Sequence, residues 1–241
     1  MNNYQKAFES YLKLTDEKER FFDYLSEVIQ KFKIKSILDI GAGNGDLAIP
    51  LSGVVERYVA VERNKNFIRI LESKNLEVIQ GDFLEEELPI KSKFDLVLCS
   101  YVIPHEDSSD KFISKDFHHV KWGGQLLIIT HTNPQVELGN FCENLDLENE
   151  WNDPTFSPRM IELLSKLGEV KQKNLSTAII SDNLEDLFLA LSFGFSIGSE
   201  EKEKLFFEKK HEAFKFLEKN YSKDGKYIFP FKHEIIHCKK T

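Results

Sequence analysis

Residues 37–46 read Ile-Leu-Asp-Ile-Gly-Ala-Gly-Asn-Gly-Asp, a short apolar run that ends in three alternating glycines. The apolar run predicts a buried strand, and Gly41, Gly43 and Gly45 predict a turn that leads into a helix. Because glycine has no Cβ and tolerates positive φ, such a turn lets a ligand come close to bare backbone. The stretch therefore predicts a ligand-binding turn at the end of a strand.

The spacing of these glycines separates two classes of ligand. A dinucleotide-binding turn reads G-x-G-x-x-G, and its third glycine would fall where Asp46 stands here. The chain instead has G-x-G-x-G, with a carboxylate at Asp39, two residues before the first glycine. This departure argues against NAD as the ligand.

Strand-like and helix-like segments alternate up to residue 130. Apolar runs predict strands at 36–40, 58–61, 76–80, 94–99 and 125–130, and helical patterns lie at 16–32, 45–54, 65–74 and 109–120. Such alternation implies a parallel sheet with right-handed crossovers. The first part of the chain is therefore predicted to form a doubly wound α/β unit.

The pattern changes after residue 130. The predicted segments there are a loop or broken helix at 131–156, a helix with Ser157 as N-cap and Gly168 past its end, a strand at 169–181, helices at 183–195 and 200–221, and a strand at 227–238. We interpret the two late helices as an insertion between the last two strands.

Composition bounds the class of protein. The chain has 241 residues, 41% of them hydrophobic, and a net charge of −8, which weighs against general nucleic-acid binding. No apolar run approaches membrane-spanning length, and the N-terminus lacks the apolar core of a signal peptide. Cys99, Cys142 and Cys238 have neither metal-ligand nor disulfide-framework spacing. We expect a reduced, soluble, cytoplasmic protein without a metal site or a membrane partner, and its oligomeric state stays open.

Three further motifs follow the predicted second, third and fourth strands. Glu62 lies seventeen residues after Gly45, Gly81-Asp82-Phe83 follows the third strand, and the fourth strand runs into Ser100 and Tyr101. The carboxyl ends of these strands meet at one edge of the sheet, where open α/β folds bind ligands. Each motif alone is explained by structure, as a tight connection, a solvated strand end or a turn residue. Their order and spacing together are hard to explain in that way.

Together the four motifs resemble those of class I S-adenosylmethionine-dependent methyltransferases. The resemblance implies a doubly wound, mostly parallel, seven-stranded sheet with an antiparallel edge strand. The chain is then expected to form a single methyltransferase domain over 1–241, made of an N-terminal helical segment (1–35), a core sheet (36–182), a helical insertion over the active site (183–225) and a final edge strand (226–241).

The resemblance also implies a site for S-adenosyl-L-methionine. Glu62 would accept hydrogen bonds from both ribose hydroxyls, Asp82 would accept from the adenine amino group, and the Phe83 N–H would donate to the adenine ring. Ser100 and Tyr101 would form walls of the methionine pocket. The complete set of expected cofactor-binding residues is Asp39, Gly41, Ala42, Gly43, Asn44, Gly45, Glu62, Arg63, Asp82, Phe83, Ser100 and Tyr101.

The implied reaction moves the sulfonium methyl group to a nucleophile by in-line displacement. Because the donor is already activated, the main task is positioning, which can supply about 7–11 kcal/mol of the barrier. A general base is needed only if the nucleophile arrives protonated. His105, which follows the fourth strand, is the candidate base, with a hydrogen-bonded loop histidine as the alternative. His131, Tyr4 and Tyr11 are further candidates to border the site.

The segments after residue 130 bear on the methyl acceptor. Seven phenylalanines lie in the late helices, at Phe188, Phe193, Phe195, Phe206, Phe207, Phe214 and Phe216. Most of them are expected to pack a core, and one or two to line a pocket for an apolar or cationic acceptor. Pro104 stands alone, without the Asn-Pro-Pro-Tyr or Asp-Pro-Pro-Tyr tetrapeptide of family members that methylate amide or base nitrogens. The leading hypothesis is a small-molecule acceptor with a nitrogen, oxygen or sulfur nucleophile. The alternatives are a protein or RNA methyltransferase and a non-catalytic S-adenosylmethionine-binding protein.

Overall fold

The chain forms two compact units in a computed structural model that describes residues 3–103, 108–148, 153–196 and 200–241. The sheet unit comprises Lys18–Thr132, Thr155–Leu175 and His233–Thr241, and the helical unit comprises Met1–Glu17, Asn133–Pro154 and Ser176–Lys232. The expected single domain over 1–241, with its internal boundaries, stays a prediction.

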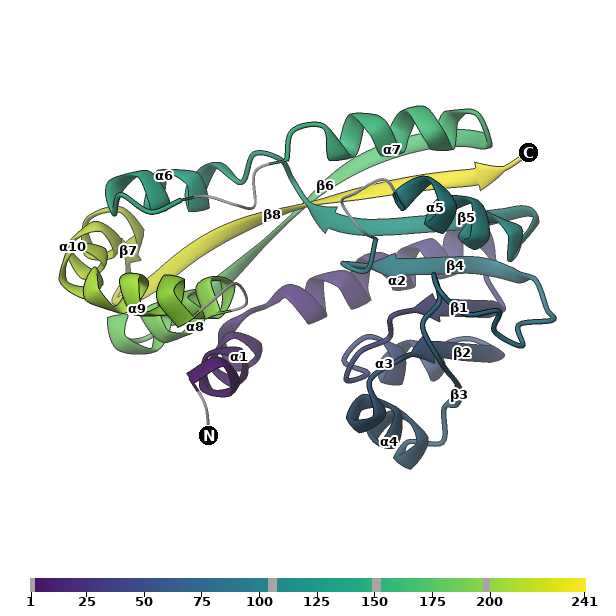
Figure 1. Ribbon diagram of the computed structural model, residues 1–241, viewed down its shortest axis with the longest axis horizontal. Helices are drawn as coiled ribbons and strands as arrows, with labels where there is room; N and C mark the ends of the chain where they lie inside the picture. The colour runs from purple at the N-terminus through teal and green to yellow at the C-terminus, as the bar shows by residue number, and fades with distance from the viewer. Residues whose placement is uncertain (1–2, 104–107, 149–152, 197–199) are drawn as a thin grey trace. The chain divides into compact units, whose positions relative to one another are not determined.

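One sheet of eight strands organises the described chain (Figure 1). Its strands are β1 (Ser36–Ile40), β2 (Arg57–Glu62), β3 (Glu77–Gln80), β4 (Phe94–Ser100), β5 (Val120–His131), β6 (Gly168–Ser181), β7 (Ser222–Lys223) and β8 (Lys226–Lys240). Their order is β3-β2-β1-β4-β5-β8-β6, and β7 pairs with β8. Strands β1 to β5 pair in parallel, whereas β8 is antiparallel to β5. The predicted doubly wound, mostly parallel fold is confirmed.

The place of the last strand differs from the prediction. Strand β8 lies between β5 and β6, so that β6, and not the final strand, forms the edge of the sheet. The burial of the two strands explains this order. Ile235 and Ile236 of β8 point to opposite faces and are both fully buried, whereas most of the first half of β6 is exposed. An inner strand needs apolar cover on both faces, and β6 does not offer it.

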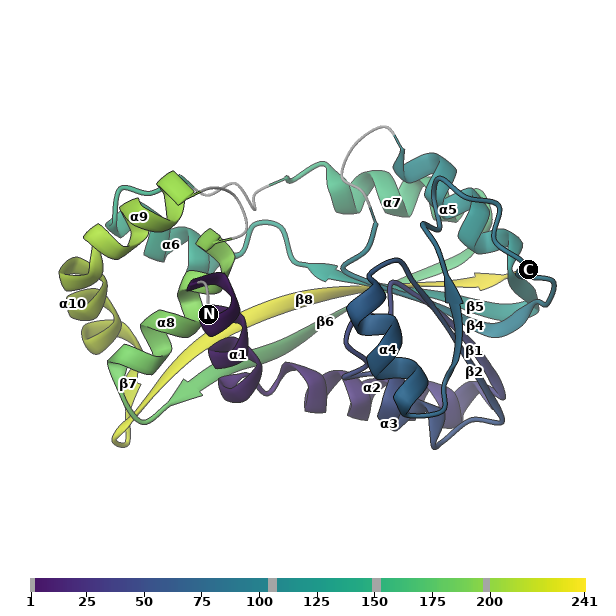
Figure 2. The ribbon, with the colours of Figure 1, turned by 60° about the horizontal axis from the view of Figure 1, so that its bottom comes forward.

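Helices cover both faces of the sheet unit (Figures 1 and 2). Helices α2 (Glu17–Phe32), α3 (Ala48–Ser52) and α4 (Lys65–Ser73) contribute to the core on one face, and α5 (Ser109–His118) and α7 (Phe156–Ser165) to the core on the other. Successive residues of β4 alternate between these cores, with Leu96 in the first and Val97 in the second. The faces are thus set by the period-two pattern of the strands.

Helix α7 begins differently from the prediction. Its N-cap is Thr155, and Ser157 lies in the first turn with its hydroxyl donating to the Glu234 carboxylate of β8. Gly168 is the first residue of β6. Ser157 is therefore used for tertiary contact, which local sequence does not reveal.

The helical unit has its own apolar core. Its helices are α1 (Asn3–Leu14), α6 (Val136–Asn144), α8 (Leu184–Ser196), α9 (Glu200–Glu208) and α10 (Lys210–Tyr221). Phe206 is fully buried and stacks on Phe188 and Phe195, with ring centroids 4.5 and 4.4 Å away. Helix α6 lies inside the predicted loop or broken helix, and the helix predicted at 200–221 is divided at Lys209 into α9 and α10.

Candidate active site

The glycine turn after β1 is held in a conformation that glycine alone adopts readily. Gly41, Gly43 and Gly45 have φ of +75°, +59° and +88°. A Cβ on Gly41 would lie 2.7 Å from Val102 Cγ2, and one on Gly45 would lie 2.8 Å from Leu71 Cδ2. These two glycines are therefore needed to pack the turn against the segment that follows β4 and against α4.

Gly43 has a different environment. Of the atoms in the described part of the chain, a Cβ there would meet only the Gly41 carbonyl oxygen, at 4.0 Å. Open space thus adjoins the backbone at the middle glycine, while the two outer glycines are packed. A ligand can approach the turn at this point, so the observed geometry fits a nucleotide-type cofactor.

The Glu62 carboxylate ties the glycine turn to the end of β2. It is 7% exposed and accepts hydrogen bonds from the N–H groups of Gly43, Arg63 and Asn64, at 2.8, 2.9 and 2.7 Å. A carboxylate has about four acceptor positions, so one position remains for a ligand hydroxyl. Acceptance from both ribose hydroxyls would require one of these three backbone bonds to open.

Asp39 lies under the turn and is bonded within the sheet. Tyr58 of β2 donates its hydroxyl to Asp39 Oδ2 at 2.7 Å, and Asp39 is 3% exposed. Burial raises the pKa of Asp39 to about 6, although the Tyr58 hydrogen bond and nearby Lys18 oppose the rise. The structure therefore gives Asp39 a part in holding β1 to β2.

Asp82 and Arg63 join the ends of β2 and β3. Arg63 Nη1 lies 2.9 Å from Asp82 Oδ2, and the N–H groups of Leu84 and Glu85 donate to Asp82 Oδ1 at 3.0 and 3.3 Å. Burial raises the pKa of Asp82, but the Arg63 bond and these N–H groups outweigh it, and the net pKa is lowered. Asp82 therefore presents an ionised carboxylate at the edge where an adenine amino group is expected.

Tyr101 follows β4 in a left-handed conformation, with φ +55°. Its N–H donates to the Ile129 carbonyl of β5 at 3.0 Å, and its hydroxyl is hydrogen-bonded to His233 Nδ1 of β8. Its ring centroid lies 4.7 Å from that of His131. The side chain therefore extends toward β5 and β8, whereas half-buried Ser100 stays at the end of β4.

The structure brings the other expected cofactor residues to the same edge of the sheet unit. Ala42 N–H donates to Val61 O at 3.2 Å, Asn44 Nδ2 donates to Asp46 Oδ2 at 2.9 Å, and the buried Phe83 ring packs edge-on against Phe112. The roles of these residues toward the cofactor stay predictions.

Of the residues expected near the methyl acceptor, only some belong to the part of the chain that the structure describes. His105 and Pro104 lie outside the described residues, as does the side chain of Tyr4. Tyr11 belongs to the helical unit, where its hydroxyl donates to Glu17 Oε2 at 2.5 Å. His131 lies at the end of β5, beside Tyr101.

Two residues that bond to side chains of the site were missed in the sequence. Tyr58 reads as an apolar strand residue, and only its cross-strand position shows that its hydroxyl serves Asp39. His233 is separated from Tyr101 by 132 residues, and no local motif marks it. It reaches Tyr101 because β8 pairs with β5, with His233 opposite His131.

Comparison with known proteins assigns the family. The family model described as a methyltransferase domain matches residues 7–168, more than half of the chain. This chain belongs to the class I S-adenosylmethionine-dependent methyltransferases. The predicted enzyme class and the predicted cofactor, S-adenosyl-L-methionine, are thereby confirmed at the level of the family.

Two relatives of this methyltransferase are named only as uncharacterized methyltransferases. It is 28% identical over 128 residues to the uncharacterized methyltransferase YcgJ of Bacillus subtilis, an alignment that spans 49% of each chain. It is 23% identical over 205 residues to an uncharacterized methyltransferase of Alkaliphilus oremlandii, spanning 83% of this chain and 84% of that one. In sequence the chain thus spans about half of YcgJ and most of the second relative.

Solved structures share the fold of the methyltransferase. The YcgJ structure aligns with a TM-score of 0.59 and 18% identity, over 90% of this chain and 97% of that one. The plantazolicin methyltransferase BpumL aligns with a TM-score of 0.54 and 13% identity, over 93% of this chain and 86% of that one.

Of the helices formed by the described residues, none is long and apolar enough to cross a membrane.

Proposed function

We propose that this methyltransferase moves the methyl group of S-adenosylmethionine to a nitrogen, oxygen or sulfur nucleophile of a small molecule. The observation that carries the proposal is the carboxyl edge of the sheet unit. There, open space adjoins Gly43, and the Glu62 carboxylate holds the turn around it. This edge is where ligands bind in open α/β sheets.

The proposed cofactor contacts follow from the groups at this edge. Glu62 would accept from a ribose hydroxyl, Asp82 from the adenine amino group, and the turn at Gly43 would lie beside the ribose and methionine parts. The cofactor supplies an activated sulfonium methyl group. The chain's part is to hold donor and acceptor in line, with His105 as the candidate base where the acceptor arrives protonated.

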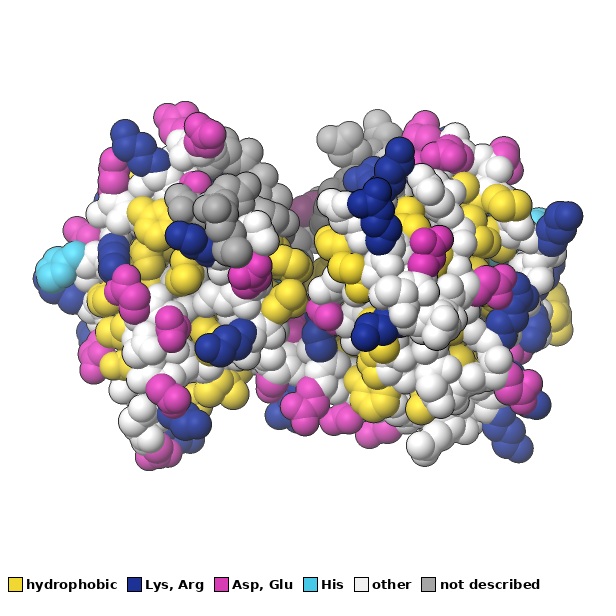
Figure 3. All heavy atoms as spheres, turned by 90° about the horizontal axis from the view of Figure 1, so that it is seen from below, with side chains coloured by type: hydrophobic (Ala, Val, Ile, Leu, Met, Phe, Trp, Pro, Cys, Tyr) yellow, Lys and Arg dark blue, Asp and Glu magenta, His cyan; other side chains and the backbone are white. Residues whose placement is uncertain are grey.

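Charge and composition support a small acceptor. The chain carries a net charge of −8, and Figure 3 shows acidic and basic side chains interspersed on the face turned to the reader. A nucleic-acid substrate is better served by a continuous basic surface. The helical unit supplies a phenylalanine-rich core of a kind that can shape an apolar pocket. BpumL, which shares the fold, was crystallised with a pentazolic desmethylPZN analog and SAH.

An RNA acceptor is the second candidate. A small-subunit ribosomal RNA methyltransferase of Arabidopsis thaliana is 35% identical over 105 residues, although that match spans only 39% of this chain and 28% of the relative. Because the shared segment is short, it supports an RNA acceptor less than a match over the whole chain would.

The cofactor site is tested by Gly43→Ala, with Gly123→Ala as the matched control. Both glycines have positive φ, +59° and +74°, and apart from the adjoining residues no atom of the described chain lies nearer than 4.0 Å to a Cβ added at either position. Each substitution should lower stability by about 1 kcal/mol through backbone strain. Only Gly43→Ala should weaken S-adenosylhomocysteine binding in calorimetry, by about tenfold or more, because its methyl group would occupy the space that the ligand needs. Equal affinities in both variants would contradict the site.

The acceptor class is tested with the same three proteins and radiolabelled S-adenosylmethionine. Each protein is incubated with the small-molecule, RNA and protein fractions of a cell extract. Label should appear in the small-molecule fraction with the wild-type chain and Gly123→Ala, and be strongly reduced with Gly43→Ala. Label in the RNA or protein fraction would favour the alternative acceptors. Binding of S-adenosylhomocysteine without transfer to any fraction would favour a non-catalytic binding protein.

A further inference from the structure

Three ring side chains meet at the carboxyl ends of β4 and β5, on the face covered by α2. The Tyr101 hydroxyl is hydrogen-bonded to His233 Nδ1, and the Tyr101 ring lies 4.7 Å from the His131 ring, centroid to centroid. His131 and His233 are register partners in the antiparallel pair of β5 and β8. All three residues belong to the sheet unit.

The two partners of this hydrogen bond have opposite environments. His233 is fully buried, and its ring packs edge-on against Phe21 of α2 at 5.0 Å and 77°. Tyr101 is 38% exposed. A buried, fixed imidazole thus orients the hydroxyl of a tyrosine whose own surface remains accessible to a ligand.

The backbone at Tyr101 is also unusual. Its φ of +55° is uncommon for an aromatic residue and costs free energy, and such positions cluster at functional sites. The next residue, Val102, would collide with a Cβ on Gly41, so Tyr101 lies one residue from the wall of the cofactor turn. Tyr101 is therefore next to the donor side of the site, and its side chain extends from there toward His131 of β5 and His233 of β8.

We propose that Tyr101 is a catalytic residue that accepts the proton of a hydroxyl acceptor carried on an aromatic ring, and that His233 is the positioning residue that holds its hydroxyl. The inference rests on the proposed methyl transfer and deepens it. It also changes the expected role of Tyr101, from a wall of the methionine pocket to a contact with the acceptor.

In this step the methyl group and one proton are transferred together. The acceptor O–H bond and the bond from sulfur to the methyl carbon break, and the bond from the acceptor oxygen to the methyl carbon forms. The acceptor proton passes to Tyr101 Oη while the Tyr101 proton passes to His233 Nδ1, which must start unprotonated to accept it. The positive charge that leaves the sulfur appears on the imidazole, so the net charge of the site does not change. After product release the proton returns through Tyr101 to water.

The chemistry of the pair indicates the class of acceptor. An amine that binds in its neutral form attacks without first losing a proton, and a thiol ionises at a lower pH than a phenol, whereas most hydroxyls stay protonated near neutral pH. The hydrogen-bonded pair of Tyr101 and His233, which can take up a proton, is therefore of most use to an acceptor that attacks through a hydroxyl group. The adjacent rings of Tyr101 and His131 offer a surface for an aromatic acceptor, since aromatic rings prefer stacked or edge-on contact.

The test uses the full chain, radiolabelled S-adenosylmethionine and five probe acceptors. Catechol and 4-hydroxybenzoate carry protonated aromatic hydroxyls, pentafluorophenol is ionised at neutral pH, and benzylamine and benzyl mercaptan carry nitrogen and sulfur. The variants are Tyr101→Phe and His233→Gln. The control is His237→Gln, because His237 lies on the same strand and packs edge-on against Phe32 of the same helix, at 5.2 Å and 87°.

The wild-type chain should methylate catechol or 4-hydroxybenzoate. Tyr101→Phe and His233→Gln should lower kcat for that acceptor by about a hundredfold or more, the usual range for loss of a general base. The KM for S-adenosylmethionine and the affinity for S-adenosylhomocysteine should stay within about threefold. Transfer to pentafluorophenol should be largely spared, because it arrives without its proton. A loss caused only by disturbed structure would affect both kinds of phenol.

Several results would overturn the inference. These are transfer only to benzylamine or benzyl mercaptan, transfer to none of the five probes, equal losses on protonated and ionised phenols, or no loss in either variant. A Tyr101→Phe variant with the binding defect of Gly43→Ala would return Tyr101 to the cofactor pocket. A wild-type chain that fails to bind S-adenosylhomocysteine would instead refute the proposed function itself.

Discussion

At the scale of single residues, Asp39 shows how a motif residue can be shaped by burial. Its carboxyl group is 3% exposed, is bonded to Tyr58, and has a pKa raised by burial to about 6. In the unfolded chain an aspartate titrates near 4. Between these two values the folded protein binds a proton that the unfolded chain does not.

Stability should therefore fall as the pH rises through this window. The contribution of protonated Asp39 is fully present below about pH 4 and is lost as the pH passes about 6. Asp39→Asn keeps an acceptor for Tyr58 but removes the titration. Relative to wild type, the variant should gain about 2 kcal/mol of unfolding free energy between about pH 4 and pH 8. Urea unfolding at both pH values measures this, and a pH-independent difference would contradict it.

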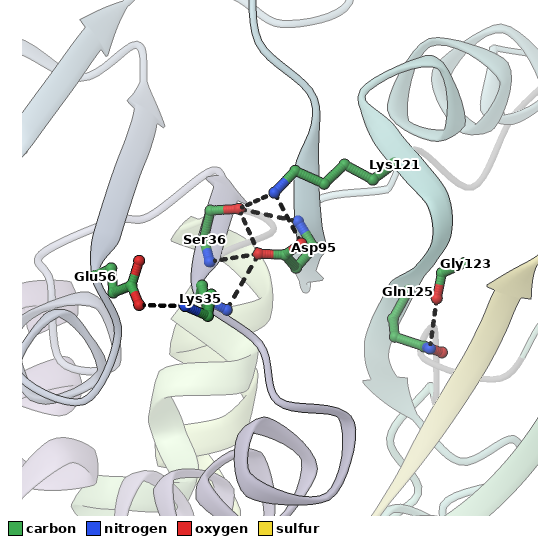
Figure 4. A network of polar contacts seen from close by, with 7 residues as sticks. All are labelled: Lys35, Ser36, Glu56, Asp95, Lys121, Gly123 and Gln125. Carbon is green, nitrogen blue, oxygen red and sulfur yellow. Dashed lines mark hydrogen bonds and ion pairs between the residues drawn. The ribbon is translucent and has the colours of Figure 1, made fainter.

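At the scale of elements, the opposite edge of the sheet is fastened by Asp95 (Figure 4). Asp95 Oδ2 accepts from the N–H groups of Lys35 and Ser36 and from the Ser36 hydroxyl, at 3.1, 2.9 and 2.8 Å. Lys121 Nζ donates to Asp95 Oδ1 at 2.8 Å. The starts of β1, β4 and β5 are thereby joined at the end of the sheet away from the glycine turn.

Asp95→Asn should weaken this fastening. One carboxylate oxygen is replaced by an amide NH2 group, which cannot accept a hydrogen bond, so about 1–3 kcal/mol of unfolding free energy should be lost. The control, Glu56→Gln, removes the exposed ion pair with Lys35 and should change stability much less than Asp95→Asn does, because solvent screens exposed pairs.

The same prediction has a pH signature. Burial raises the pKa of Asp95, but the bonds from Lys121 and Ser36 outweigh it, and the net pKa is lowered. The stabilisation is thus present above the unfolded value and is lost as the pH falls through the folded one. Chemical unfolding at neutral and acidic pH should show the unfolding free energies of wild type and Asp95→Asn converging in acid. A difference between the two proteins that stays constant with pH would argue against Asp95 as the source.

At the scale of the whole molecule, the residues expected to bind the cofactor all belong to the sheet unit, whereas the phenylalanine core belongs to the helical unit. Phe206→Ala should cost about 3–5 kcal/mol in the helical unit, because Phe206 is fully buried in two ring stacks. Leu205→Ala, at a position 41% exposed, is the control and should cost much less.

Under conditions where Phe206→Ala remains folded, affinity for S-adenosylhomocysteine should stay within about threefold of wild type, since Phe206 packs in the core of the helical unit and the expected cofactor residues belong to the sheet unit. Unfolding curves and calorimetry on the same samples measure the two effects. A folded variant that no longer binds would show that the helical unit contributes to the cofactor site.

The sequence alone determined the mostly parallel sheet and predicted a cofactor site at its carboxyl edge, because both features depend on local patterns. The alternation of apolar runs indicates parallel strands, and the spacing of Gly41, Gly43 and Gly45 with Glu62 and Asp82 suits one ligand. Turn conformation and strand polarity follow from neighbouring residues in the chain, so these signals can be read without a structure.

Only the tertiary structure decided which strands are neighbours and which distant side chains meet. Strand β8 pairs with β5 inside the sheet because Ile235 and Ile236 need apolar neighbours on both faces of the sheet. This pairing places His233 beside Tyr101. The same packing lets the Ser157 hydroxyl donate a hydrogen bond to Glu234 and the Tyr58 hydroxyl donate one to Asp39. Such pairings are set by the packing of segments far apart in sequence, and a local pattern of residues does not contain them.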